Sequence, residues 1–208
     1  ESVTKDLLNR AEFSGCKVLI ILADVPSFGY RPRDIRNGLA MPPKLTLKNI
    51  IQVLKKPEWA LKTLINGQPS FEVLKPYMPK SLNLKQLAKF MDSTFSGRLN
   101  EEKIKKLRDS WKGKLVIKGT ESVHDIEKAH KLGVDGIIIS NHGGRQVDVG
   151  QATVDSLKTL APIYKGKLKI MMDSGIRGGA DVARVLGVGA DFTFLGRSFM
   201  YGVSALGS

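Results

Sequence analysis

The sequence predicts an α/β fold, an incomplete (β/α)8 or TIM barrel, because short apolar runs alternate with segments of helical period along most of its length. The runs LVI, GIII, IMM and FTFL are continuously apolar, which is typical of parallel strands covered on both faces. Each run is followed by a segment long enough for the crossover helix that parallel strands need. Polar or glycine-rich residues end each run, at the position where barrel enzymes carry their active sites.

Five βα units are predicted along the chain. In the first, a helix near residues 4–15 precedes a strand in KVLIILAD, residues 17–24. The other units pair strands with helices at 114–119 and 122–133, 135–144 and 154–165, 168–175 and 178–189, and 191–198 and 198–207. From Lys118 to Arg197, successive strand ends lie 24, 31 and 24 residues apart, close to the length of one unit.

The number of units predicts that the barrel is incomplete. A whole barrel has eight units and about 250 residues, whereas five units and one insertion use up these 208 residues, which begin with Glu1 and not with Met. We therefore expect residues 1–208 to be the C-terminal part of one barrel domain, with three strands upstream. Such a partial sheet would leave two parallel edges open.

A large insertion is predicted at about residues 40–100, because 94 residues separate the strand ends at Asp24 and Lys118. Four apolar residues share helical spacing there: Leu47, Ile50, Ile51 and Leu54. Pro57 suits the first turn of a second helix. A basic amphipathic segment of this kind could cover the active site, pack against a neighbouring subunit or lie on a membrane.

The positive charge is concentrated in one region. Of a net charge of +13, residues 41–120 contribute +11, from 17 Lys and Arg against 6 Asp and Glu. Such a segment suggests an anionic partner, either lipid head groups or nucleic acid, although a solvated lysine-rich surface is the simpler interpretation. No run reaches the about 18 apolar residues that a spanning helix needs, and the start is not signal-like, which predicts an intracellular protein. The single cysteine, Cys16, is expected to be buried and structural.

The motif SNHGGRQVD, residues 140–148, is the strongest chemical signal. His142 and Arg145 follow a buried strand in a glycine-containing loop, so both can face one ligand. This pair suits proton removal next to a carboxylate, with imidazole as the base and guanidinium as a bidentate clamp. A loop histidine alone is more often structural, but its Asn, Gly and Arg neighbours favour catalysis here.

SNHGGRQ resembles the active-site signature of the FMN-dependent 2-hydroxy-acid oxidases and dehydrogenases, the family of lactate and glycolate oxidation. LVIKG, DSGIRGG and FLGRSFMYG follow in the family's order and spacing, and residues 23–47 resemble the segment after its fourth strand. The resemblance implies an FMN flavoprotein that oxidises a small L-2-hydroxy acid, most plausibly L-lactate, to the 2-oxo acid.

The same resemblance implies a role for each matching residue. His142 would abstract the α-proton, and Asp24 would orient its ring and stabilise the imidazolium. Arg145 and Arg31 would bind the substrate carboxylate. FMN would be bound through the following residues: Lys118, Ser140, Asp173, Ser174, Gly175, Ile176, Arg177, Gly196 and Arg197. No metal site is expected, and His124 and His130 are predicted to be surface residues.

Two differences from the family concern the flavin. Leu22 and Val25 stand where the family commonly has threonine, and the family's early-strand tyrosines, serine and glutamine are outside these residues. We therefore expect the chain alone to bind FMN poorly and to be inactive. Trp59 and Trp111 are expected in a core or an interface.

The expected partners are a 2-hydroxy acid, an anionic membrane surface or respiratory electron acceptor, and further copies of the chain, a tetramer by family resemblance. No nucleic acid is expected. The predicted location is the cytoplasm, with peripheral attachment to the inner face of the cell membrane as an extension of that prediction. Two alternatives stay open: an FMN- or phosphate-binding barrel with isomerase or nucleotide chemistry, and a non-catalytic anion-binding protein.

Overall fold

The computed structural model describes residues 2–25, 31–38, 46–67, 72–78, 86, 90, 99–147 and 149–207. The chain divides into two compact units. The first joins Glu1–Tyr30 to Gly97–Ser208 and holds the sheet, and the second is Arg31–Ser96.

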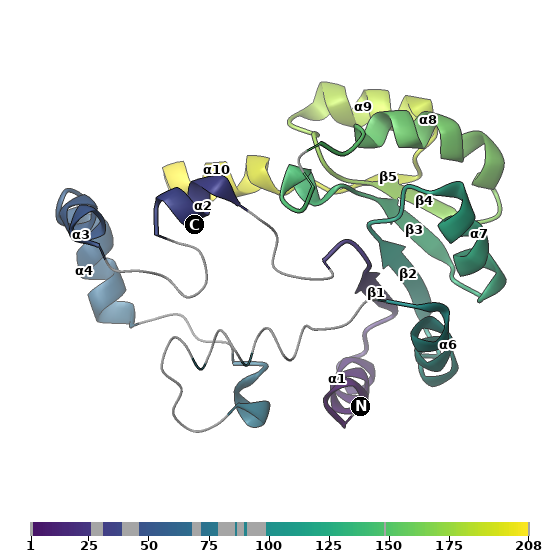
Figure 1. Cartoon of the computed structure of the whole chain (residues 1–208), viewed down its shortest axis with the longest axis horizontal. Helices are drawn as coiled ribbons and strands as arrows, with labels where there is room; N and C mark the ends of the chain where they lie inside the picture. Colours follow the sequence, from purple (N-terminus) through teal and green to yellow (C-terminus); the bar gives the residue numbers. More distant parts are fainter. Residues whose placement is uncertain are drawn as a thin grey trace. The chain divides into compact units, whose positions relative to one another are not determined.

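Five parallel strands form one sheet in the first unit (Figure 1). They are β1 (Val18–Leu22), β2 (Lys114–Lys118), β3 (Gly136–Ile139), β4 (Lys169–Met172) and β5 (Phe192–Thr193). Their order in the sheet is β1-β2-β3-β4-β5, and each neighbouring pair is parallel. The predicted α/β class is confirmed, since strands that follow one another in the chain are also neighbours in the sheet, as in a barrel.

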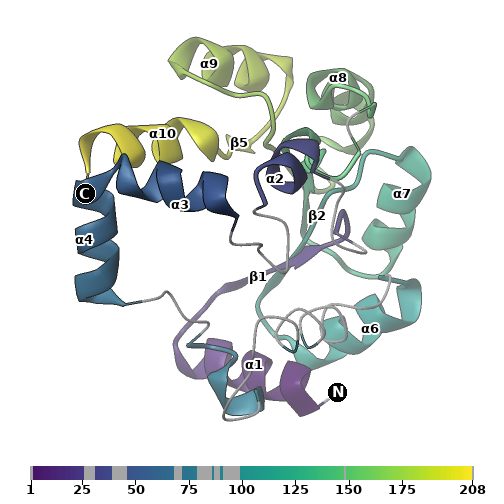
Figure 2. The same ribbon diagram turned by 60° about the vertical axis from the view of Figure 1, so that its left-hand side comes forward.

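Helices connect these strands and cover one face of the sheet (Figure 2). The first unit contains α1 (Ser2–Phe13), α6 (Glu101–Ser110), α7 (Val123–Lys131), α8 (Thr153–Tyr164), α9 (Gly179–Val188) and α10 (Arg197–Leu206). Asn100 caps α6, since its side chain accepts a hydrogen bond from the backbone N–H of Lys103 at 2.9 Å. A glycine in the left-handed region follows α7, where Gly133 has φ +76.

The core lies between the sheet and α6, α7, α8 and α9. Ile137, Ile139 and Ile170 pack with Leu157 and Leu160 of α8, and all five side chains are fully buried. A second cluster packs β1 and β2 against α6 and α7. Ile138, on the other face of β3, is buried as well, so both faces of this strand are covered and its apolar run is continuous.

The two edge strands are less covered. Among the described residues, β1 and β5 each pair with one strand, which agrees with the expected open edges. Alternate residues of β1, namely Val18, Ile20 and Leu22, are exposed on the face away from the helices, while Leu19 and Ile21 pack against the second cluster.

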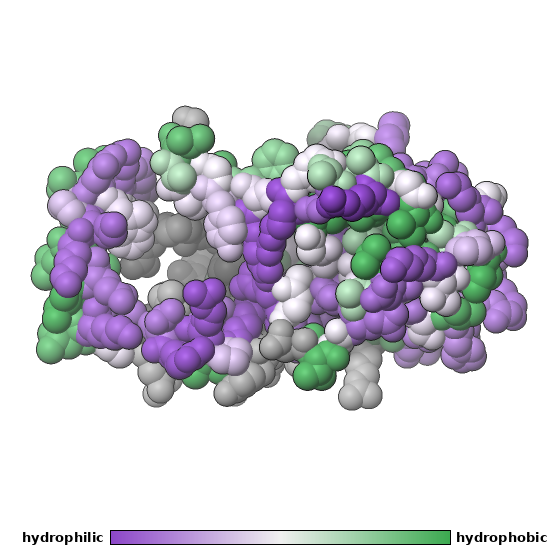
Figure 3. Space-filling view, turned by 90° about the horizontal axis from the view of Figure 1, so that it is seen from above, coloured by the Kyte–Doolittle hydropathy of each residue, from purple (hydrophilic) through white to green (hydrophobic). Residues whose placement is uncertain are grey.

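The second unit contains the described helices of the predicted insertion. They are α2 (Pro32–Arg36), α3 (Leu47–Leu54), α4 (Pro57–Asn66) and the 3₁₀ helix η1 (Lys75–Tyr77). Thr46 caps α3 by accepting the backbone N–H of Asn49 at 3.3 Å, and Pro57 begins α4, so both predicted helices are confirmed. Figure 3 shows hydrophobic and hydrophilic side chains next to one another over this helix pair, at the left of the view.

The positions of five other residues test predictions of burial. Cys16 is exposed, so the expected burial is wrong: it lies in the turn between α1 and β1 and belongs to neither of the two described core clusters. Trp111 is buried, whereas Trp59 is more than half exposed within its unit, so its interface role stays a prediction. His124 and His130 are exposed, as expected. No helix among the described residues is long and apolar enough to cross a membrane.

Candidate active site

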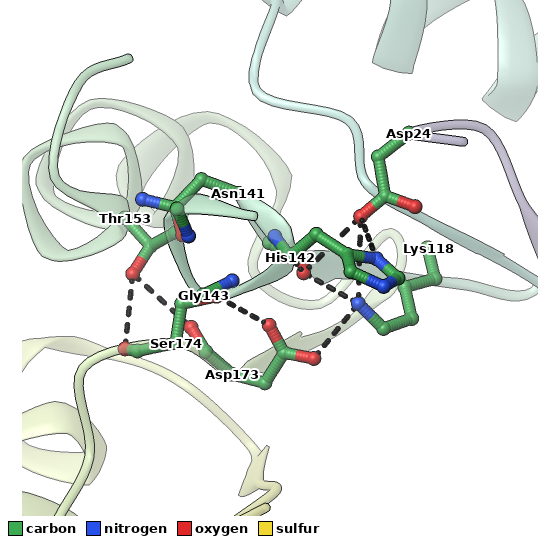
Figure 4. A network of polar contacts seen from close by, with 10 residues as sticks. Asp24, Lys118, Asn141, His142, Gly143, Thr153, Asp173 and Ser174 are labelled. Atoms are coloured by element: carbon green, nitrogen blue, oxygen red, sulfur yellow. Dashed lines mark hydrogen bonds and ion pairs between the residues drawn. The ribbon is translucent and has the colours of Figure 1, made fainter. Parts of the chain in front are cut away.

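Side chains that follow four neighbouring strands meet at the carboxyl end of the sheet (Figure 4). Asp24 follows β1, Lys118 ends β2, His142 follows β3 and Asp173 follows β4. Parallel strands bring these ends to one edge, so residues far apart in the sequence become neighbours there.

His142 and Asp24 form a hydrogen-bonded pair. The Nδ1 atom of His142 lies 3.1 Å from Oδ2 of Asp24, whose side chain is only 9% exposed. A carboxylate that accepts the Nδ1 proton leaves the lone pair of Nε2 free to take up another proton. The His142 side chain is 27% exposed, so it is accessible from outside the core. The pair therefore has the geometry of a general base with an orienting acid.

The loop that carries His142 depends on left-handed backbone. His142 has φ 56, Gly143 has φ 67 and Gly144 has φ 69. Asn141 stabilises this turn, since its Oδ1 accepts the backbone N–H of Gly144 at 3.2 Å. A histidine at positive φ is uncommon and costs backbone energy, so its presence at the site indicates a functional constraint.

Glycine is also required opposite Asp24. Gly119 follows β2 with φ +93, and a Cβ atom there would lie 2.4 Å from Cβ of Asp24. No side chain fits at that distance. The LVIKG motif therefore ends in glycine because Asp24 packs directly against its backbone.

Lys118 joins the two acidic residues of the site. Its Nζ lies 2.8 Å from Oδ2 of Asp173 and 3.5 Å from Oδ2 of Asp24, and its side chain is 17% exposed. It also donates a hydrogen bond to the hydroxyl of Ser140. A cation this deeply placed needs such partners, since burying an unpaired charge is costly.

Ser140 is a buried centre of the network. Its Oγ accepts the backbone N–H of His142 at 3.1 Å and donates to Oδ2 of Asp24 at 3.4 Å. Ser140, which carries no net charge, thereby links Lys118 to the His142–Asp24 pair.

The next strand end supplies a turn beside the histidine loop. Ser174, with φ 73, donates from Oγ to Oδ1 of Asp173 at 2.8 Å and accepts the backbone N–H of Gly143 at 3.0 Å. Arg197 at the start of α10 donates to the carbonyl of Gly143 at 2.6 Å. A Cβ at Gly143 would lie 3.0 Å from this guanidinium, so the glycine permits the contact.

A cavity of ≈ 270 Å³ lies at this junction. Its wall combines basic, polar, glycine and apolar residues: Lys118, His142, Gly143, Arg145, Asp173, Ser174, Gly175, Ile176, Arg177, Phe194, Leu195, Gly196, Arg197 and Met200. Four of these are lysine or arginine against one aspartate. The cavity therefore favours an anionic ligand.

The structure thus brings together all but one of the residues that the sequence analysis selected. Asp24 and Ser140 join through the hydrogen-bonded network, and the others line the cavity. Arg31 belongs to the second unit, where its Nη1 lies 3.9 Å from Oδ2 of Asp34, so its role stays a prediction.

Sequence reasoning missed Thr153 and the structural part of Asn141. Asn141 stands inside the selected motif, so its spacing to Gly144 could have indicated a turn. Thr153 begins α8 and hydrogen-bonds the carbonyls of Asp173 and Ser174, a relationship that no local pattern reveals.

Glu121 is a further acid behind the site. Burial raises its pKa, a hydrogen bond from Ser156 opposes the shift, and the negative charge of Asp24 adds to it. The described residues contain no group of three or more His, Cys, Asp or Glu side chains placed to hold a metal ion.

Comparison with known sequences decides the family. Residues 1–208 match the family described as FMN-dependent dehydrogenase. The chain belongs to this family. The resemblance to the FMN-dependent 2-hydroxy-acid oxidases and dehydrogenases is therefore confirmed.

Relatives of this FMN-dependent dehydrogenase chain include L-lactate dehydrogenases. Those of Vibrio cholerae serotype O1 (strain M66-2) and Haemophilus influenzae (strain PittEE) are 37% and 36% identical over 204 residues, 98% of this chain. The match covers 54% and 53% of these relatives, so the chain spans about half of their length.

Solved structures of the same family share the fold. The monotopic membrane protein (S)-mandelate dehydrogenase has a TM-score of 0.89 and 30% identity, over 99% of this chain and 54% of that one. A mandelate oxidase variant with (S)-mandelic acid has a TM-score of 0.71 and 28% identity, over 100% of this chain and 49% of that one. The incomplete barrel is thus the form that these FMN-dependent dehydrogenase folds take over the shared half.

The donor set of the cavity fits the family's cofactor, FMN. Lys118 supplies a fixed positive charge, Arg177 and Arg197 supply two more, and Gly175 and Gly196 have open space where a Cβ would project. Such a set would suit a cofactor that carries an anionic phosphate and an electron-accepting ring. Leu22, in register with Lys118, offers no hydrogen bond where the family commonly has threonine.

Proposed function

We propose that the protein oxidises a small L-2-hydroxy acid, with L-lactate as the first candidate, to the 2-oxo acid, using FMN. The observation that carries this proposal is the contact of 3.1 Å between His142 Nδ1 and Asp24 Oδ2, beside a cavity rich in cations. The names of the L-lactate dehydrogenase relatives support the same substrate class.

In this proposal His142 is the base. Its Nε2 takes the α-proton of the substrate, and Asp24 stabilises the imidazolium that forms. Arg145 lines the same cavity as His142, and its guanidinium would bind the substrate carboxylate. Arg31 is proposed as the second arginine for the carboxylate.

The remaining site residues are proposed to hold the cofactor. FMN, when bound, accepts the two electrons that the hydroxy acid loses. Lys118 places positive charge where negative charge develops, and the ion pair with Asp173 keeps its side chain in place. Ser140 and Asp173 offer polar groups, residues 174–176 offer backbone amides, and Arg177, Gly196 and Arg197 suit the phosphate.

The test is the visible spectrum of the full-length protein before and after anaerobic addition of L-lactate. We expect a flavin band that bleaches in the wild type and stays in His142→Gln. Bleaching that survives this substitution would contradict the role of His142 as base. A colourless protein that binds no added FMN would contradict the whole proposal and favour an anion-binding role.

A second substrate, (S)-mandelate, is suggested by the names of the structural relatives. Both acids place a carboxylate and a hydroxyl on one carbon, so His142 and Arg145 would treat them alike. The ratio of kcat/KM for the two acids, measured on one preparation, decides between them.

We also propose that residues 1–208 belong to one barrel domain, with an insertion at about 40–100 that attaches to the membrane surface. In the described part of the insertion, Leu54, Leu64 and Ile65 are each more than two thirds exposed and lie near lysines. The relative with the TM-score of 0.89 is described as a monotopic membrane protein. Peripheral attachment to the inner face of the cell membrane would place the protein beside a respiratory electron acceptor, and a tetramer is the proposed assembly.

Vesicle sedimentation of the full-length protein tests this attachment. We expect it to pellet with vesicles of anionic lipid and less with neutral vesicles, and Leu64→Asp should weaken the effect. Leu206→Asp is the matched control, an equally exposed leucine outside the insertion. Equal recovery in the supernatant with both lipids would remove the proposal.

A further inference from the structure

Residues 174–176 form a turn with a cavity on each side. One side faces the cavity of ≈ 270 Å³ that also contains His142. The other faces a second cavity of ≈ 310 Å³, whose lining includes residues at the starts of α8 and α9, and both cavities have Ser174, Gly175 and Ile176 in their walls. With little packed against this turn, its conformation depends on its hydrogen bonds.

The backbone of the turn is in an unfavourable region. Ser174 has φ 73, where residues other than glycine are rarely found, and Gly175 has φ 77 with nothing within 4 Å of the point where a Cβ atom would lie. Strain of this kind persists only where surrounding contacts enforce it. Ile176 anchors one end in the core, and at the other end the backbone N–H of Asp173 donates to the carbonyl of Ile139 at 3.1 Å. The carbonyls of Asp173 and Ser174, between these anchors, need a separate contact.

Thr153 supplies that contact (Figure 4). Its hydroxyl lies 3.1 Å from the carbonyl oxygen of Asp173 and 3.4 Å from that of Ser174, and the residue is 3% exposed. A hydroxyl has one proton to donate, so the two carbonyls share it. Thr153 is the first residue of α8, which the fully buried Leu157 and Leu160 fix to the core.

The two residues that Thr153 holds reach opposite parts of the site. Asp173 pairs with Lys118 through its carboxylate at 2.8 Å. Ser174 accepts the backbone N–H of Gly143, the neighbour of His142, at 3.0 Å. One hydroxyl on the core-anchored helix α8 is therefore linked, through Asp173 and Ser174, to both the cation and the loop of the base.

We propose that Thr153 is a positioning residue of the FMN site, holding the 173–176 turn so that Lys118 and the His142 loop keep their places. This inference rests on the proposed function for its consequence in catalysis. Thr153 touches no reacting atom and acts through Asp173 and Ser174.

The experiment compares three variants of the full-length protein. Thr153→Val keeps the shape and removes the hydroxyl, Thr153→Ser keeps the hydroxyl, and Thr159→Val is the matched control. Thr159 lies on the same helix, but on its exposed side, where the hydroxyl donates to the Asp155 carbonyl of the same helix at 3.3 Å. The measurements are the Kd for FMN, from quenching of flavin fluorescence, and amide hydrogen exchange of peptides covering 141–147 and 173–178.

We expect Thr153→Val to bind FMN about ten-fold more weakly, the effect of one lost buried hydrogen bond. Both peptides should exchange faster in this variant, while Thr153→Ser and Thr159→Val stay close to the wild type. The proposal is overturned if Thr153→Val lowers only the melting temperature, with the Kd and the exchange of both peptides unchanged. Failure of Thr153→Ser to restore the Kd would overturn it too.

These outcomes are separable from failure of the proposed function. If the wild type binds FMN but no hydroxy acid bleaches it, the activity is wrong while the Kd comparison still tests Thr153. If the wild type binds no FMN, hydrogen exchange alone decides. Faster exchange of both peptides in Thr153→Val supports the role of Thr153 in holding the 173–176 turn, and unchanged exchange contradicts it.

Discussion

The ammonium group of Lys118 lies 2.8 Å from the Asp173 carboxylate, inside a site that also contains the Asp24 carboxylate at 3.5 Å. Two acids that meet at one edge of the sheet would repel each other without this cation between them. Lys118 therefore has a structural role before any cofactor is considered, and the two roles can be separated by substitution.

Lys118→Met should destabilise the protein by about 2 kcal/mol, between the values for exposed and buried ion pairs, because it leaves two carboxylates without their cation. Urea denaturation of both proteins measures this difference. Lys118→Arg keeps the charge and should recover most of the stability but not the FMN affinity, because a planar guanidinium cannot replace the compact ammonium. Equal stability of Lys118→Met and the wild type would show that the two acids are already compensated elsewhere.

Asp24→Asn should slow flavin reduction by about 10³-fold, since the neutral amide neither stabilises the imidazolium nor selects the required tautomer, as in other histidine-based sites. KM should change little, because Asp24 lies behind the histidine. Stopped-flow reduction with L-lactate measures the rate. A rate within three-fold of the wild type would contradict the orienting role of Asp24. Such a difference corresponds to less than about 1 kcal/mol, no more than an ordinary hydrogen bond contributes.

The strands and their order could be predicted because continuous apolar runs, such as those containing Ile137 and Ile170, are typical of strands buried on both faces. The residues of the site could be selected because each stands directly after a strand. The hydrogen bond from Thr153 to the Asp173 carbonyl could not be predicted. It joins the start of a helix to a turn 20 residues later, in a geometry that only the folded chain defines. The predicted burial of Cys16 was wrong for a related reason. Residue type predicts average burial, whereas the position of Cys16 in a short connection determines its actual exposure.

Gly119→Ala should abolish FMN-dependent activity and lower stability, because its Cβ would lie 2.4 Å from Cβ of Asp24 and push that side chain away from His142. Gly15→Ala is the matched control, since Gly15 also has a positive φ of +73 but nothing within 4 Å of the added atom. Both variants carry the backbone cost of about 1 kcal/mol, so the additional loss in Gly119→Ala measures the clash alone. Thermal unfolding and the rate of flavin bleaching, recorded on both variants, should therefore differ between them, and identical behaviour would show that Asp24 can shift freely.

Glu121→Gln should stabilise the protein increasingly as the pH rises. Burial, with the charge of Asp24, raises the pKa of Glu121 in the folded state above its ordinary value of 4.5. The folded state therefore binds this proton more tightly than the unfolded state. Its contribution to stability is complete below pH 4.5 and is lost as the pH rises through the raised folded pKa. Glutamine has no proton to lose, so the variant avoids this loss.

Glu127→Gln should change the pH dependence of stability in the opposite direction, which makes it a comparison for Glu121→Gln. A hydrogen bond and the charge of Lys131 lower the pKa of Glu127, whose side chain is exposed. Its contribution to stability is present above the ordinary pKa and is lost as the pH falls. Glu127→Gln should therefore lower the free energy of unfolding slightly more at pH 7 than at pH 4. Free energies of unfolding in urea, measured from pH 4 to pH 8 for both variants and the wild type, should give slopes of opposite direction relative to the wild type. A difference between Glu121→Gln and the wild type that stays constant over this range would mean that Glu121 titrates as an exposed acid, and that its contact with Ser156 does not keep it in the interior.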